Sequence, residues 1–228
     1  SVLLGQIMLA AIKSGERVCI ASFEMQPQAT FGRMMKQELD SENPSKSTVL
    51  QVVSEMKDTM FTFALIGSGK TDRVLSVFEY AYRRYGVRQF VIDSLMKLGL
   101  SEDDYSGQKL VVEKLADFCN EHNVSIHLVA HARKGADEMK PPSKMDIKGS
   151  GGITDLADNV FCVYRNRSKE KQKREYYENN KDPLPCGSVI DSINEQYDAI
   201  LSCEKCRDNG ENEGKWGLYF NKHTLVYN

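Results

Sequence analysis

Short apolar runs alternate along the chain with longer segments in which apolar residues recur every three or four positions. Runs that are hydrophobic at consecutive positions are typical of strands buried on both faces of a sheet. The longer spacing is typical of helices. Strands and helices that alternate in this way bury both kinds of surface in a parallel sheet covered by helices. The strands expected in this sheet are residues 17–23, 61–66, 88–93 and 125–131.

The intervening segments predict helices, and the last part of the chain predicts further strands. Helices are expected at residues 2–13, from Pro27 through Met34, and at residues 48–58, 71–85 and 106–122. Strands are expected at residues 159–164 and 199–203, followed by a terminal pair of strands within 216–227. We therefore expect one α/β domain over residues 1–228. Residues 165–195, rich in Lys, Arg, Glu and Asn, predict a solvated insertion or mobile loop.

Composition limits the partners and the compartment of such a domain. The 228 residues carry a net charge of −2, so any nucleic acid would have to bind a local patch or a channel built by several subunits. No apolar run reaches the roughly 18 residues of a membrane span, so no membrane association is expected. Three of the six cysteines lie inside apolar runs, which suggests a reducing, cytoplasmic location.

Cys203 and Cys206 form the one CxxC pair of the sequence. A structural zinc site usually needs a second pair, so zinc would require Cys186 and His223 to lie nearby. The simpler interpretation is that both cysteines are ordinary positions on one strand.

Polar side chains follow several predicted strands at the point where each strand ends. They are Glu24, the Asp93–Ser94 pair, His131, Lys205 and Arg207. Ligands of open parallel sheets bind outside the carboxyl ends of the strands. Acidic residues there can hold magnesium and orient a water molecule, and Lys and Arg can stabilise a transferring phosphoryl group. The set therefore predicts phosphate chemistry.

Two segments are candidates for the phosphate-binding loop. Residues 67–71 (GSGKT) resemble the end of a Walker A motif, but Ala64 stands where the motif requires glycine, which favours a polar turn before the next helix. The helix expected at residues 2–13 matches the helix that follows a Walker A loop. We interpret Ser1 as the hydroxyl residue of that loop, with its Gly-Lys pair upstream.

Taken in order, these motifs resemble the motor domain of DnaB-type replicative helicases, a RecA-like P-loop NTPase core, and most closely the bacteriophage primase-helicases. Glu24 in FEM resembles the catalytic base, Asp93 in VIDSLMKLG the Walker B aspartate, and His131 in LVAHARKG the residue that senses the γ-phosphate. Lys205 and Arg207 in LSCEKCRDNG resemble the lysine and arginine finger that reach the neighbouring subunit's nucleotide.

The resemblance also implies two loops that grip DNA. One is the basic stretch after His131, and the other lies within DIKGSGGITDLADNVFCVYRN, where glycines let backbone amides approach phosphates. The residues carried over are Arg133, Lys134, Lys140, Lys144, Lys148, Gly149, Ser150 and Gly151.

The implied protein is a hexameric ring that hydrolyses ATP and moves 5′ to 3′ on single-stranded DNA in a bacterial or phage-infected cell. ATP and Mg²⁺ are its expected cofactors, with Ser1 and Asp93 supporting the metal and Ser1, Lys205 and Arg207 binding nucleotide. A primase would be fused or associated. Hydrolysis is expected of the parent protein rather than of this chain alone. The alternatives are a RecA- or KaiC-like switch or recombinase, and a non-catalytic interaction domain of the same fold.

Overall fold

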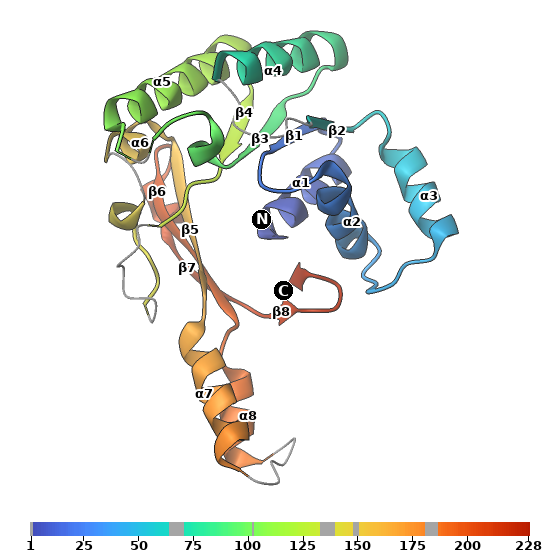
Figure 1. The fold of residues 1–228 in the computed structure, drawn as a ribbon, viewed down its shortest axis with the longest axis vertical. Helices are drawn as coiled ribbons and strands as arrows, with labels where there is room; N and C mark the ends of the chain where they lie inside the picture. Colours follow the sequence, from blue (N-terminus) through green and yellow to red (C-terminus); the bar gives the residue numbers. More distant parts are fainter. Residues whose placement is uncertain (1, 64–70, 102, 133–139, 148–150, 181–186) are drawn as a thin grey trace. The chain divides into compact units, whose positions relative to one another are not determined.

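A computed structural model gives the fold (Figure 1) and describes all residues except 1, 64–70, 102, 133–139, 148–150 and 181–186. The chain forms two compact units. The first comprises Ser1–His131, Lys148–Ala157 and Asn221–Val226. The second comprises Ala132–Ile147, Asp158–Phe220 and Tyr227–Asn228. Each unit is described by itself below.

The first unit is built on a four-stranded parallel sheet with the strand order β2-β1-β3-β4. This confirms the parallel sheet predicted from the alternation of strands and helices. Because β1 and β3 are the two central strands, most of their residues are buried on both faces, which explains their unbroken apolar runs. The strands are β1 Val18–Ser22, β2 Met60–Phe63, β3 Gln89–Asp93 and β4 Ser125–Leu128.

Helices cover both faces of this sheet, and strand residues alternate between two cores. Cys19 and Phe90 belong to a core built with α4 and α5, whereas Ile20 and Val91 belong to a core built with α1, α2 and α3. Figure 1 shows these two groups of helices on opposite sides of the strands. The helices are α1 Val2–Lys13, α2 Pro27–Glu38, α3 Lys46–Met56, α4 Thr71–Tyr85, α5 Tyr105–His122 and α6 Gly151–Leu156.

Local signals fix several helix ends. Pro27 begins α2, where its missing N–H costs nothing. Ser45 caps α3 by accepting a hydrogen bond from the Thr48 N–H. Asp104 caps α5 in the same way, and Asn123 ends that helix in the left-handed conformation. These short-range contacts explain why the sequence predicted most helix boundaries closely.

The second unit contains an antiparallel sheet of strand order β5-β6-β7, which confirms the expected antiparallel strands near the end of the chain. Val160 pairs with Lys205 but Phe161 pairs with Cys203, so a bulge leaves Glu204 without a partner in the register. β8 and β9 form a separate two-stranded sheet. The strands are β5 Asn159–Arg165, β6 Ala199–Cys206, β7 Gly214–Leu218, β8 Phe220–Asn221 and β9 Val226–Tyr227.

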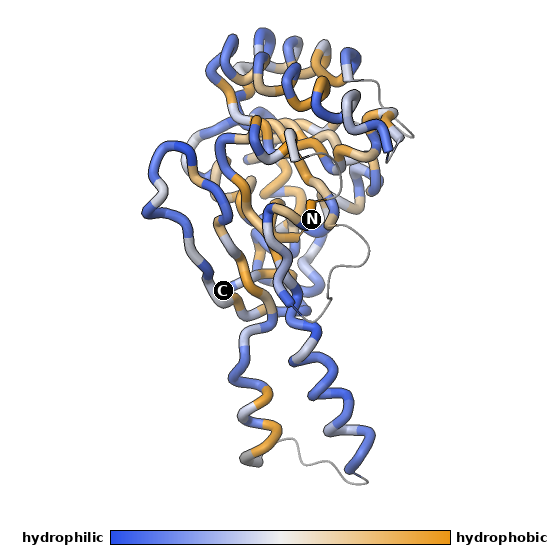
Figure 2. Tube along the Cα trace, turned by 90° about the vertical axis from the view of Figure 1, so that its left-hand side faces the viewer, coloured by the Kyte–Doolittle hydropathy of each residue, from blue (hydrophilic) through white to orange (hydrophobic). Residues whose placement is uncertain are grey.

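The segment expected to be a solvated insertion or loop contains two helices, α7 Arg167–Asn179 and α8 Ser188–Glu195. Figure 2 shows why the sequence hid them: α7 is hydrophilic along nearly its whole length, while α8 carries the apolar residues. Asn166 caps α7 by accepting from the Lys169 N–H, and Ile190 and Ile193 of α8 are buried. The expectation of a loop is therefore corrected to a helical pair, whereas its mobility stays a prediction.

Lys169 is the exception in a charged run, residues 169–174, that we expected to be a solvated face. Its side chain is only 6% exposed. Its ammonium lies 2.7 Å from Asp198 Oδ1 and donates to the carbonyls of Asn194 and Gln196. Burial raises the pKa of Asp198, but hydrogen bonds from Lys169 and the Phe220 N–H outweigh it and leave the pKa below its ordinary value. The ammonium therefore ties α7 to the end of α8.

Lys169→Met is expected to lower the free energy of unfolding by about 2 kcal/mol. This is less than the roughly 3–5 kcal/mol of a fully buried pair, because Asp198 is 36% exposed and water screens it. Urea unfolding should show the loss at neutral pH. It should shrink as the pH falls through the lowered pKa of Asp198, since protonated Asp198 no longer rewards Lys169. Lys171→Met, at an exposed position of α7, is the control; equal stability of the two variants would contradict the role of Lys169.

Candidate functional site

The carboxyl ends of β1 and β3 define the candidate site in the first unit. From β1 the chain continues to β2 on one side of the sheet, while β3 lies on the other side. The strand order therefore reverses between β1 and β3, which is where open α/β sheets bind ligands. Ser22 pairs in register with Asp93 at this edge, and Glu24 follows two residues later.

Glu24 is held by two hydrogen bonds that end on the same carboxylate oxygen. The Ser94 hydroxyl donates to Oε1 over 2.9 Å, and His131 Nε2 lies 3.1 Å from Oε1. Because an ionised carboxylate only accepts hydrogen bonds, Nε2 must carry the proton in this pair. Within the described part of the chain, Oε2 of Glu24 accepts no hydrogen bond. The carboxylate is thus oriented through one oxygen while the other is available to a ligand or water.

The surroundings of Glu24 keep it ionised. The hydrogen bond from His131 lowers its pKa most, and the Ser94 hydrogen bond and the positive charges of His131 and Lys97 lower it further. Partial burial acts in the opposite direction but does not prevail. A carboxylate with a lowered pKa is a weak base, so its contribution to a reaction at neutral pH is to orient and polarise a water molecule.

Asp93 lies at the end of β3 and is 8% exposed. Backbone hydrogen bonds hold both sides of the strand end: the Phe23 N–H donates to Asp93 O, and the Leu95 N–H donates to Val129 O. Carboxylate and hydroxyl oxygens are the ligands that Mg²⁺ prefers. Asp93 beside Ser22 therefore fits a magnesium-supporting position, whereas Ser1 lies outside the described residues.

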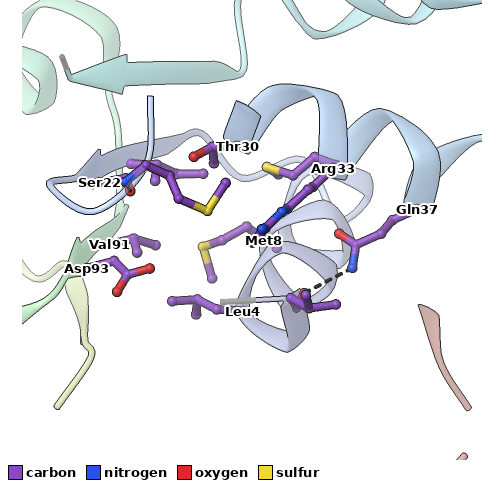
Figure 3. A pocket seen from close by; sticks show the side chains of 13 residues that line it. Leu4, Met8, Ser22, Thr30, Arg33, Gln37, Val91 and Asp93 are labelled. Carbon is purple, nitrogen blue, oxygen red and sulfur yellow. Dashed lines mark hydrogen bonds between the residues drawn. The ribbon is translucent and has the colours of Figure 1, made fainter. Parts of the chain in front are cut away.

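A small cavity of about 30 Å³ lies between α1, β1, α2 and β3 (Figure 3). Asp93 and Ser22 line one side of it, and Arg33 and Gln37 of α2 line another. The volume suits a water molecule and is far below the roughly 300 Å³ or more of a small-molecule site. The cavity is therefore the floor beneath the strand ends, and a nucleotide would have to bind above it.

His131 lies beyond β4, on the far side of β3 from β1, and its side chain is 51% exposed. The Val129 N–H donates to Ile92 O, which carries the chain alongside β3 towards Glu24. The structure thus gathers Glu24, Asp93 and His131 at one edge of one sheet. Ser94 and Lys97 were assigned no role from sequence. Ser94 stands next to Asp93 at a strand end, which was a signal, but its bond to a residue 70 positions away was not.

Lys205 and Arg207 belong to the second unit, at the end of β6. The Arg207 N–H donates to Asp158 O, and its guanidinium lies 2.6 Å from Asp158 Oδ1. Both side chains of this ion pair are more than half exposed. The bulge at Glu204 lies just before the basic pair, and bulges re-aim the side chains that follow them.

Only part of the expected DNA-binding set falls within the described residues. Lys140 and Lys144 are exposed in the second unit, and Lys144 opens a 3-10 turn capped by Ser143. Gly151 begins α6 in the first unit. Arg133, Lys134, Lys148, Gly149 and Ser150 lie outside the described residues, as do residues 67–70 of the alternative phosphate loop.

The described ranges contain neither a metal-ligand cluster nor a membrane-spanning helix. There, no group of three or more His, Cys, Asp or Glu residues is placed to hold a metal ion. Cys203 and Cys206 are free thiols, and Cys186 lies outside the described residues. No described helix combines the length and the apolar character needed to cross a membrane.

A parallel sheet with acidic residues and a histidine at its switch point defines the chain as an α/β domain of the nucleotide-binding ATPase class. Comparison with protein families agrees: residues 3–137 match the AAA domain, and the chain belongs to this family.

Two solved structures share the fold over 94% of this chain, each with a TM-score of 0.68 and 16% sequence identity. One is the ATPase domain of a phage helicase, of which the chain covers 75%. The other is described as a DnaB-like replicative helicase and its interactions with primase, of which it covers 52%. The fold is therefore the RecA-like fold of DnaB-type helicase motor domains, as the motifs implied.

Proposed function

We propose that the chain is the motor domain of a replicative DNA helicase that hydrolyses ATP and moves 5′ to 3′ on single-stranded DNA as a hexameric ring. The observation that carries the proposal is the position of Glu24. It lies at the switch point of a RecA-like sheet beside the strand end of Asp93, with one carboxylate oxygen held by Ser94 and His131 and the other available. This arrangement suits the activation of a water molecule against a phosphate.

In the proposed reaction, ATP phosphates lie at the start of α1, where backbone amides and the helix dipole favour negative charge. Ser1 and Asp93 would support Mg²⁺, and the metal, when bound, neutralises charge on the phosphates. Glu24 orients a water molecule through Oε2. Water oxygen bonds to the γ-phosphorus, the bond to the β–γ bridging oxygen breaks, and ADP and phosphate leave.

His131 connects this chemistry to DNA. It contacts Glu24 directly and is followed within two residues by the first basic stretch expected to face DNA. A γ-phosphate that competes for His131 would release Glu24 and shift the chain beyond residue 131. Arg133, Lys134, Lys140, Lys144 and the residues 148–151 would then grip the phosphate backbone without reading sequence.

Lys205 and Arg207 complete the site from a neighbouring copy. Both carry positive charge at the end of an exposed strand, and the ion pair of Arg207 with Asp158 lies at the surface, where such a pair is worth little. A nucleotide of the next subunit could therefore attract the guanidinium away from Asp158. This is the geometry of an arginine finger supplied in trans. A primase is a further proposed partner.

A switch-type ATPase of the RecA or KaiC kind remains the second candidate, because the same sheet and the same Glu24 arrangement would serve it. The two differ in what DNA does to turnover. A translocating motor couples hydrolysis to DNA, whereas a switch does not need DNA to hydrolyse ATP.

The ATPase activity of the full-length parent protein is expected to rise severalfold on adding single-stranded DNA. The stimulation should fall steeply with salt, because contacts to the phosphate backbone release counterions. Steady-state hydrolysis measured with and without DNA, at fixed and then increasing salt, checks this. Hydrolysis that ignores DNA would favour the switch, and the absence of hydrolysis and nucleotide binding would leave only the non-catalytic domain.

A further inference from the structure

Gln37 of α2 joins two segments that are far apart in the sequence. Its side-chain amide is buried, and the residue is 8% exposed. Nε2 donates one hydrogen bond to Val2 O over 3.0 Å and another to Leu225 O over 2.7 Å. Figure 3 shows the first of these bonds reaching the first turn of α1. Both amide hydrogens are thus used to bind backbone carbonyls of the two segments.

The close approach of α1 to Gln37 depends on Gly5. A Cβ at position 5 would lie 2.9 Å from Gln37 Oε1 and 3.4 Å from Met34 Cγ. The first of these distances is too short for any real side chain, so Gln37 would have to move. A glycine in a helix interior normally lowers helix stability. Here it makes room for the hydrogen-bonded amide.

The other acceptor, Leu225, belongs to a turn that packs on the first unit, Asn221–Val226. Asn221 organises the turn by accepting hydrogen bonds from the N–H groups of His223 and Thr224, and Thr224 is buried. His223 adds a second anchor, since its Nδ1 lies 2.9 Å from Glu42 Oε2. The turn is therefore a fixed part of the first unit and can serve as a support for Gln37.

We propose that Gln37 is a positioning residue for the nucleotide, fixing the first turn of α1 by tying it to the Asn221–Val226 turn. The inference rests on the proposed function, in which ATP phosphates bind at the start of α1. Amide donors bind phosphate tightly only when their directions are fixed beforehand. Affinity for ATP therefore depends on a turn near the end of the sequence that contributes no residue to the chemistry.

Gln37→Met in the full-length parent protein tests this directly. Methionine keeps the length and volume of the side chain but removes both donors. The dissociation constant of a non-hydrolysable ATP analogue and the KM for ATP are expected to rise about tenfold, equivalent to about 1.4 kcal/mol. The kcat should stay within about twofold, because the groups around Glu24 are untouched and saturating ATP restores the bound state.

Gly5→Ala perturbs the same contact from the other side. Alanine favours a helix, so a purely structural view predicts a more stable protein with unchanged ATP affinity. We expect instead the same rise in the dissociation constant, because the new methyl group displaces the Gln37 amide. The effects of Gln37→Met and Gly5→Ala should not add in the double variant, since each removes the same hydrogen bonds.

Gln51→Met, at an exposed position of α3, is the matched control and should leave binding unchanged. A parent protein that neither binds nor hydrolyses ATP would refute the proposed function itself. An active parent whose ATP affinity is unchanged in both Gln37→Met and Gly5→Ala would overturn the inference about Gln37 alone. So would a loss confined to kcat. If Gln37→Met fails to fold, the affinity of Gly5→Ala decides between these outcomes.

Discussion

Glu24→Gln is expected to lower the kcat of DNA-stimulated ATP hydrolysis by the parent protein on the order of 10²–10⁴-fold, the usual contribution of a general base. Glutamine has the shape of glutamate and keeps an oxygen that can accept the Ser94 hydroxyl. Its amide carries no negative charge and cannot take a proton from water. ATP binding should therefore survive while turnover is lost.

Steady-state hydrolysis and binding of a non-hydrolysable ATP analogue separate these two effects. Glu55→Gln, which changes an exposed carboxylate on α3 in the same way, should leave both unchanged. A Glu24→Gln protein that keeps most of its kcat would remove Glu24 from the chemistry. Loss of nucleotide binding together with turnover would instead indicate that Glu24 holds the site together.

Arg207→Ala is expected to lower kcat by about 10³–10⁵-fold, the range found for arginine fingers. The guanidinium would stabilise the charge that develops on the phosphate in the transition state, so ground-state binding should change much less. Arg83→Ala, which removes an exposed guanidinium paired with Glu79 on α4, is the control. Normal turnover in Arg207→Ala would contradict the finger assignment.

Mixing the two inactive variants tests whether the finger acts in trans. An Arg207→Ala subunit has an intact Glu24, and a Glu24→Gln subunit has an intact Arg207. Where the two meet in the correct order, one complete site forms, so mixed rings should recover part of the hydrolysis. Recovery would support a site shared between copies. If Arg207 acted within its own chain, mixing would restore nothing.

The sequence predicted the elements whose signals are local. The helices Val2–Lys13 and Thr71–Tyr85 begin and end where their apolar spacing indicated, and the parallel sheet followed from alternating strands and helices. Because parallel strands share one carboxyl edge, the sequence also predicted that Glu24 and Asp93 would lie at the same edge. The roles of these residues stay predictions until the variants are measured.

The tertiary structure decided what depends on partners distant in the chain. It showed that Ser94 and His131 share one oxygen of Glu24, across 70 and 107 positions of sequence. It placed Lys169 of a charged run in a buried ion pair and formed helices from residues expected to be a loop. It also connected Gln37 to Val2 and Leu225. Periodicity and capping act within a few residues and can be read along the chain, whereas a polar side chain's partners are chosen only when packing brings remote segments together.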